Sequence, residues 1–167
     1  QNEKATLNVA PYKKTAFCTH YNTMLDSLRL AKKASLKKTI AEASGEFAIA
    51  SLHRFETISQ KKKLEQVVNE LIKISKQIKI LFILHPPTRV ALKKSYLYDL
   101  LEKESACQLL PRLGFFEFNH LLRKAKFIMT DGGSNQEECS YLGTPCLLFR
   151  SETERMEGLN TNVVLSK

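Results

Sequence analysis

Short, almost continuously apolar runs recur along this chain, separated by longer amphipathic stretches. Apolar runs of four to eight residues without alternation are typical of β-strands buried on both faces. His85-Pro86-Pro87 and Asp131-Gly132-Gly133 directly follow two of these runs and mark where the strands should end. We predict buried strands at 47–52, 79–84, 125–130 and 146–149, with shorter candidates at 15–19, 108–110 and 162–165.

Between the apolar runs, hydrophobic residues recur at every third or fourth position, which is the spacing of an amphipathic helix. Leu64, Val67 and Leu71 show this spacing clearly. Ser44-Gly45 should end the first helix, and Gly143 should end the last because glycine readily adopts the left-handed conformation there. We predict helices over 23–43, 59–78, 90–104, 115–124 and 137–142.

Buried strands that alternate with helices indicate an α/β fold with a doubly wound, mostly parallel sheet and helices on both faces. The length of 167 residues is that of one ordinary domain, large enough to bury a real core. In such sheets, ligands bind in a crevice outside the carboxyl ends of the strands. The residues that directly follow the strands are therefore the first candidates for function.

Polar and charged groups follow four of the predicted strands. His53-Arg54 follow the first, His85 the second, Asp131 to Ser134 the third, and Arg150 the fourth. A lone histidine would be taken as an ordinary core or surface residue, but two at equivalent strand ends are candidates for ligand contact. We expect these groups to meet in one crevice.

The segment from Asp131 to Glu138 carries the clearest chemistry. Two glycines and a serine occupy the turn between a predicted strand and a predicted helix, where exposed N–H groups and the helix dipole favour phosphate. Glu137 and Glu138 lie one turn further on and can accept hydrogen bonds from sugar hydroxyls. Alternatively, they are first-turn acids favoured by the dipole alone. The segment predicts a nucleotide or nucleotide-sugar ligand.

Composition excludes several other classes. The net charge of +9 allows nucleic-acid binding, but no aromatic residues are interleaved with the lysines and tryptophan is absent. The lysines fit solvated helix faces better. Four cysteines without a CxxC pair indicate reduced thiols and no metal site. Reduced thiols indicate a cytoplasmic protein. No apolar run reaches eighteen residues, so we expect no membrane span. We also expect no metal and no cofactor.

Several short motifs occur in a fixed order between about Asn22 and Ser166, and together they resemble one family. The chain resembles the carboxyl-terminal half of the non-hydrolysing UDP-N-acetylglucosamine 2-epimerases. The motifs that are similar to the family's are Ser51 to Glu56, Leu84-His85-Pro86, Leu113 to Phe118, Gln136-Glu137-Glu138, Leu142 to Pro145 and Thr153 to Gly158.

The resemblance implies a GT-B architecture, in which two Rossmann-like domains hold the ligand between them. Residues 46–167 would be the nucleotide-binding domain, and residues 1–45 would be a lead-in segment and helix of the inter-domain crossover. The family eliminates UDP and adds it back with inversion at carbon 2 of the sugar. The carboxylates for proton transfer there come from an amino-terminal domain that this chain lacks, so we expect the chain alone to be inactive.

The resemblance also implies roles for single residues. Glu138 would hold the ribose hydroxyls, Gly132, Gly133 and Ser134 the diphosphate, and Phe118 the uracil. Phe115 and Phe116 share its helical spacing, so we expect two of the three phenylalanines in the core.

His53 would approach the diphosphate and assist departure of UDP. Arg155 would complete the anionic pocket together with Arg150. Alternatively, these arginines pair with the acidic residues around them, Glu152, Glu154 and Glu157. The implied partners are UDP, a UDP-amino sugar, the amino-terminal domain and a second copy of the chain.

Three positions depart from the family pattern. The turn is Asp-Gly-Gly-Ser instead of Asp-Ser-Gly-Gly, Thr57 replaces an asparagine, and Met156 replaces a proline. The sugar and an epimerising or hydrolysing outcome therefore stay open. So do two other functions: the nucleotide-binding half of a GT-B glycosyltransferase, and a non-catalytic basic module for a nucleotide or nucleic acid.

Overall fold

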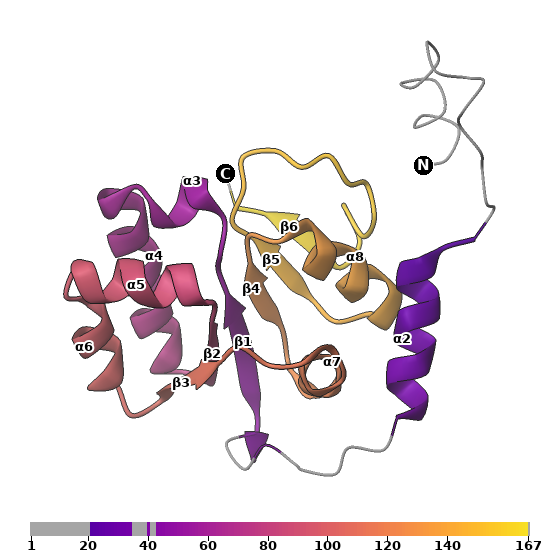
Figure 1. Ribbon diagram of the computed structural model, residues 1–167, viewed down its shortest axis with the longest axis horizontal. Helices are drawn as coiled ribbons and strands as arrows, with labels where there is room; N and C mark the ends of the chain where they lie inside the picture. The colour runs from indigo at the N-terminus through magenta and orange to yellow at the C-terminus, as the bar shows by residue number, and fades with distance from the viewer. Residues whose placement is uncertain (1–20, 35–39, 41–42, 167) are drawn as a thin grey trace.

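The computed structural model describes residues 21–34, 40 and 43–166. Six parallel strands form one sheet in the order β3-β2-β1-β4-β5-β6 (Figure 1). The predicted α/β fold with a parallel sheet is confirmed. The strands are β1 (Phe47–Ser51), β2 (Lys79–Leu84), β3 (Cys107–Pro111), β4 (Ile128–Thr130), β5 (Cys146–Leu148) and β6 (Val163–Leu165).

This strand order reverses direction once, between β1 and β4. The chain runs outward from β1 to β3, returns to the other side of β1 at β4, and then continues outward to β6. At such a switch point the loops after the two central strands diverge and leave a crevice. The segments that follow β1 and β4 begin with Leu52-His53 and Asp131-Gly132. Topology alone therefore brings these segments together.

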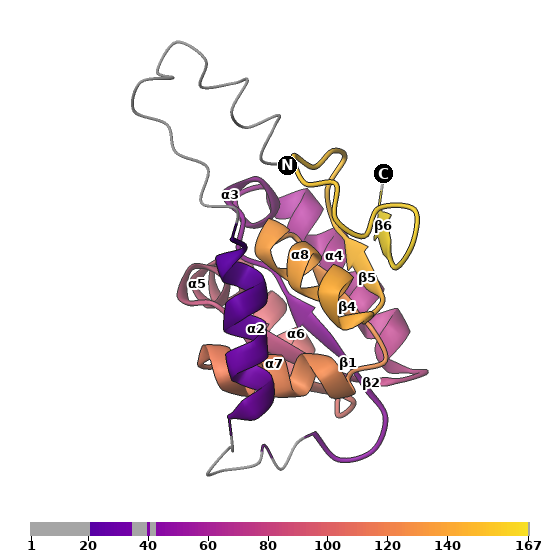
Figure 2. The same cartoon turned by 90° about the vertical axis from the view of Figure 1, so that its right-hand side faces the viewer.

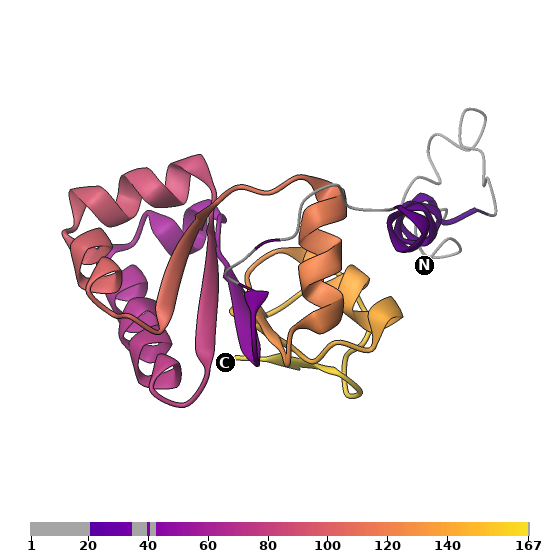
Figure 3. The same cartoon turned by 90° about the horizontal axis from the view of Figure 1, so that it is seen from below.

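Helices cover both faces of the sheet (Figure 3). α4 and α6 pack on one face through leucines and valines such as Leu71 and Leu101, and α7 and α8 pack on the other through Leu121 and Cys139. α2 lies outside α7 and α8 (Figure 2). The helices are α2 (Thr23–Lys33), α3 (Phe55–Ile58), α4 (Lys61–Ser75), α5 (Pro86–Lys94), α6 (Leu97–Glu102), α7 (Phe115–Lys124) and α8 (Gly133–Leu142).

Several predicted helices differ in extent from those observed. The helix expected over 90–104 is two helices, α5 and α6, separated by Tyr96 in a left-handed conformation with φ 60°. α5 also begins earlier, because a proline at its first position needs no hydrogen-bond partner. The helix expected over 23–43 ends at Lys33, where Ala34 is extended. The strand predicted at 15–19 lies outside the described residues.

The helix that matters most for function also begins earlier than predicted. α8 starts at Gly133 rather than Glu137, so Gly133 and Ser134 form its first turn and only Gly132 precedes it. Gly143 ends the helix with φ 74°, as expected. The amino-terminal end of α8 therefore lies directly beside the strand ends. Within the described part of the chain, no helix has the length and apolar character needed to cross a membrane.

Candidate functional site

A cavity of about 320 Å³ lies at the carboxyl ends of β1, β2 and β4. Its walls include His53, His85, Phe118 and the Gly132–Asn135 segment. The structure thus brings together residues that the strand-end rule and the resemblance indicated separately. Larger depressions, of about 470 and 570 Å³ against α4 and about 370 Å³ beside β3, contain none of these residues.

Asp131 lies behind this cavity rather than in it. Its carboxylate is 0% exposed and accepts hydrogen bonds from the backbone N–H of His53, at 3.0 and 3.1 Å, and of Arg54, at 3.0 Å. Its Oδ1 is also 3.4 Å from Nδ1 of His53. The sequence predicted Asp131 as a ligand contact. Its carboxylate oxygens instead accept hydrogen bonds from the turn after β1.

The two strand-end histidines stack on each other. Their ring centroids are 4.6 Å apart, and the planes are inclined by 29°. Burial lowers the pKa of His85, and the positive charges of His53 and Arg112 lower it further. Arg112 lines the same cavity and was missed by sequence reasoning. The signal was available, because Arg112 directly follows β3 as His85 follows β2.

Arg54 does not line this cavity. Its Nε is 3.4 Å from a carboxylate oxygen of Glu56, and its backbone N–H is bound to Asp131. Phe115 and Phe116 are 38% and 46% exposed, so the expectation that two phenylalanines lie in the core was wrong. These two residues begin α7 at the crevice, and the buried face of the helix is made by residues further along, such as Leu121.

Neighbouring side chains lie so close to the start of α8 that only glycine fits there without a shift. A Cβ on Gly132 would lie 2.9 Å from Cε1 of His53 and 2.9 Å from Oδ1 of Asn135. A Cβ on Gly133 would lie 3.0 Å from Nε of Arg155. His53 and Arg155 therefore flank the first turn of α8. Gly132 is the N-cap and offers no side chain to the free N–H groups of that turn, which leaves them available to an anion.

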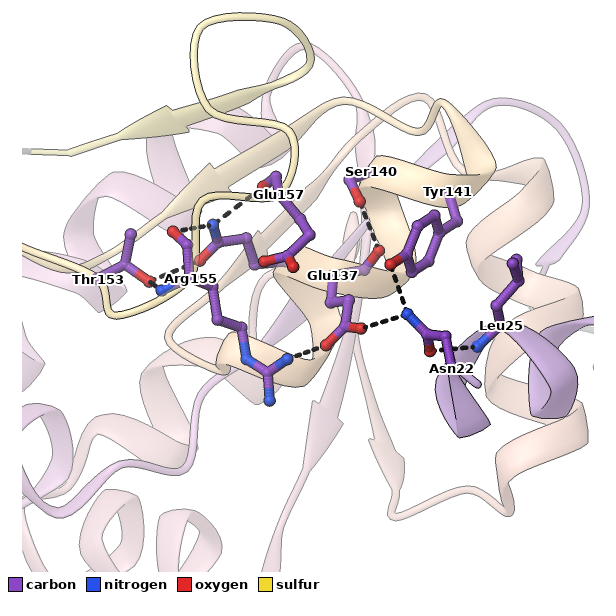
Figure 4. Close-up of polar contacts among 9 residues, drawn as sticks. Asn22, Leu25, Glu137, Ser140, Tyr141, Thr153, Arg155 and Glu157 are labelled. Carbon is purple, nitrogen blue, oxygen red and sulfur yellow. Dashed lines mark hydrogen bonds and ion pairs between the residues drawn. The ribbon is translucent and has the colours of Figure 1, made fainter. Parts of the chain in front are cut away.

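The two neighbouring acids of α8 have different surroundings, although both are buried. Glu137 pairs with Nη1 of Arg155, and its other oxygen is 3.4 Å from Nδ2 of Asn22 (Figure 4). Oε2 of Glu138 is buried and has no hydrogen-bond partner. Burial raises the pKa of Glu138 to about 7, although a hydrogen bond with Asn135 lowers it in part. Glu138 therefore has an acceptor atom to offer.

The loop at 149–158 is held over α8 by Gln136. Nε2 of this buried residue donates to the backbone oxygens of Arg155 and Glu157, at 3.1 and 3.0 Å, and its Oε1 accepts from Thr153 at 2.7 Å. Nε of Arg155 is buried without a partner. The Nε–H group of Arg155 is thus a donor without an acceptor, beside the first turn of α8.

Both arginines of this loop, Arg150 and Arg155, form ion pairs with acidic residues, as one alternative in the sequence analysis held. Only Arg150 pairs with one of the acids named there. Nη2 of Arg150 is 2.7 Å from Glu154, whereas Arg155 pairs with Glu137. Arg150 lines the depression of about 470 Å³ beside α4, not the cavity that contains His53.

The comparisons with known proteins agree on one family. A family model described as UDP-N-acetylglucosamine 2-epimerase matches residues 15–166. The chain belongs to this family. It is 32% identical over 139 residues to a UDP-N-acetylglucosamine 2-epimerase homolog of Methanococcus maripaludis, and 31% identical over 145 residues to the UDP-N-acetylglucosamine 2-epimerase of Methanocaldococcus jannaschii. These alignments cover 82% and 83% of this chain, but 38% and 39% of the relatives.

Solved structures show the same relationship. The M. jannaschii enzyme in complex with UDP-GlcNAc and UDP is similar with a TM-score of 0.74 at 28% identity, over 86% of this chain and 41% of the enzyme. A heptosyltransferase of Escherichia coli with an ADP sugar has a TM-score of 0.55 at 18% identity, over 79% of this chain and 39% of the enzyme, which shows a shared fold alone. The chain thus spans about 40% of the length of the relatives that it matches.

Proposed function

We propose that this chain is the nucleotide-binding domain of a UDP-N-acetylglucosamine 2-epimerase and binds the UDP part of a UDP-amino sugar. The observation that carries the proposal is the unpartnered, buried oxygen of Glu138, one turn into a helix whose first turn lies between His53 and Arg155. A buried polar atom without a partner costs free energy, and a ligand hydroxyl would remove that cost.

The three parts of UDP are assigned to three parts of the site. The diphosphate lies at the first turn of α8, where the N–H groups of Gly133 and Ser134, the imidazole of His53 and the free Nε of Arg155 can meet it. The ribose hydroxyls donate to Glu138. Uracil lies against Phe118 at the wall of the cavity.

The reaction proposed for the whole enzyme is elimination of UDP from the sugar and its return with inversion at carbon 2. The contribution of this domain is to bind the leaving group and to stabilise the negative charge that develops on it. The proton transfers at carbon 2 need carboxylates on both faces of the sugar. We assign those to an amino-terminal domain, and propose that residues 46–167 form the nucleotide domain while residues 1–45 lead into it.

Titration calorimetry with UDP tests the proposal. UDP should bind and ADP should bind at least tenfold more weakly, because a purine does not fit a pyrimidine site beside Phe118. Glu138→Gln should weaken UDP binding, whereas Glu102→Gln on the distant helix α6 should not. Binding of an oligonucleotide in place of UDP would support a basic binding module instead, and equal binding of ADP would favour a glycosyltransferase domain.

A further inference from the structure

His53 lies beside Gly132, and Arg155 lies beside Gly133, the next residue of the chain. The edge of its ring that carries Cε1 lies over Gly132, so that no side chain fits between them. Nδ1, one of the two nitrogens bonded to Cε1, is 3.4 Å from Oδ1 of Asp131. An imidazole reaches a ligand with only one nitrogen at a time, and the partner of the other nitrogen decides which one carries the proton.

The carboxylate of Asp131 is itself held firmly. Its Oδ2 accepts from the N–H groups of both His53 and Arg54, while its Oδ1 accepts from the N–H of His53 and faces the ring. Because an ionised carboxylate only accepts hydrogen bonds, its neighbour Nδ1 is the nitrogen that carries a proton. Nε2 is then the nitrogen left for a ligand.

We propose that Asp131 is the positioning residue of this site: it fixes the ring of His53 and stabilises the ring when both of its nitrogens carry a proton, so that Nε2–H donates to the diphosphate. The proposal rests on the proposed function for the identity of the anion. It changes the part played by Asp131 from a contact of the nucleotide to a residue that acts through His53. The competing explanation is that Asp131 only anchors the turn between β1 and α3.

The tautomer is measured first, without any ligand. Long-range ¹H–¹⁵N correlation spectra at alkaline pH should show a protonated Nδ1 and an unprotonated Nε2 for His53. In Asp131→Asn, the amide oxygen should take the place of Oδ2, where two backbone N–H groups point. The amide NH₂ then faces Nδ1 and the proton should move to Nε2. A protonated Nε2 in the unchanged protein at this pH overturns the proposal, and this measurement needs no variant to fold.

A double-mutant cycle then separates positioning from anchoring. Asp131→Asn should weaken UDP binding about tenfold, because an amide does not stabilise the doubly protonated ring that binds the anion. This is the lower end of what loss of an orienting partner costs a ligating histidine. In a His53→Gln background, which keeps the backbone bonds to Asp131, the same change should alter affinity less than twofold. An equal loss in both backgrounds assigns Asp131 to anchoring and overturns the proposal. If the unchanged protein does not bind UDP, the proposed function fails while the tautomer measurement still decides the role of Asp131.

Discussion

Two walls of the crevice are held in place by different kinds of contact. The histidine wall, formed by His53 and His85 with Asp131 behind them, follows directly from the sheet and is anchored through backbone N–H groups. The arginine wall, formed by the loop 149–158, is anchored by side chains of α8, mainly Gln136 and Glu137. Contacts to buried backbone groups open only with the fold, whereas a loop held by side chains opens locally. We therefore expect the first wall to be the more rigid of the two.

The largest expected effect is at the histidine wall. Asp131 is 0% exposed, and Asp131→Ala leaves the N–H groups of His53 and Arg54 without their acceptor, so the free energy of unfolding should fall by about 4 kcal/mol. Urea denaturation followed by circular dichroism measures this. A loss no larger than that of an exposed acid such as Glu65→Ala would contradict the importance of the anchor.

The next effect concerns Glu138, which lies between the walls and is paired with neither. Its pKa is raised to about 7 in the folded protein from an ordinary value of 4.5. The fold therefore disfavours the ionised form. The contribution of Glu138 to the free energy of unfolding is most favourable below pH 4.5 and declines as the pH rises to 7. Glu138→Gln should remove this decline and raise stability at pH 8 by about 3 kcal/mol. Urea denaturation of the unchanged protein and of Glu138→Gln across this pH range is the measurement. The same pH dependence of the free energy of unfolding in both proteins would contradict the prediction.

Paired glycine substitutions compare the two walls directly. Alanine at Gly132 would press on the ring of His53, which Asp131 and His85 hold, so Gly132→Ala should cost about 2 kcal/mol. Alanine at Gly133 would press on the flexible chain of Arg155, which can give way, and alanine also favours the helix, so Gly133→Ala should be nearly neutral. Thermal denaturation of both variants is the measurement. If Gly133→Ala lowered stability more than Gly132→Ala, the arginine wall would be the more rigid one.

The smallest global effect is expected for Gln136→Ala. Loss of its bonds to the loop should lower the free energy of unfolding by only about 1 kcal/mol, because the released groups can meet water. Local opening should rise much more, so trypsin should cleave after Arg155 faster than in the unchanged protein at the same temperature. Ser140→Ala, on the same helix, is the matched control and should leave the cleavage rate unchanged.

Much of the histidine wall was predictable from sequence, because it depends on local order along the chain. An apolar run sets where a strand ends, and the next residue is delivered to the crevice, as for His53 and His85. The glycines after β4 likewise marked the turn at which α8 begins. The predicted start of α8 was four residues late, because glycine and serine are poor helix formers and only their place beside the strand ends makes them helical.

The arginine wall was much less predictable. The pairing of Arg155 with Glu137 joins residues 18 positions apart and depends on how the loop returns over α8. Nearby acids such as Glu154 and Glu157 were equally good partners on charge alone. The burial that raises the pKa of Glu138 is also a property of packing, which no local pattern contains.

The strand order has a consequence for the chain during its synthesis. β1, β2 and β3 and the helices between them leave the ribosome before β4, and domains made in this direction can begin to assemble early. The side of β1 that β4 will occupy, at Ile49 to Ser51, is then an open edge and a template for wrong pairing. The crevice needs β1 and β4 together, so a nascent chain gains its ligand site only after Asp131 has emerged. The proposed nucleotide site should accordingly be completed late, after most of the helix content is already in place.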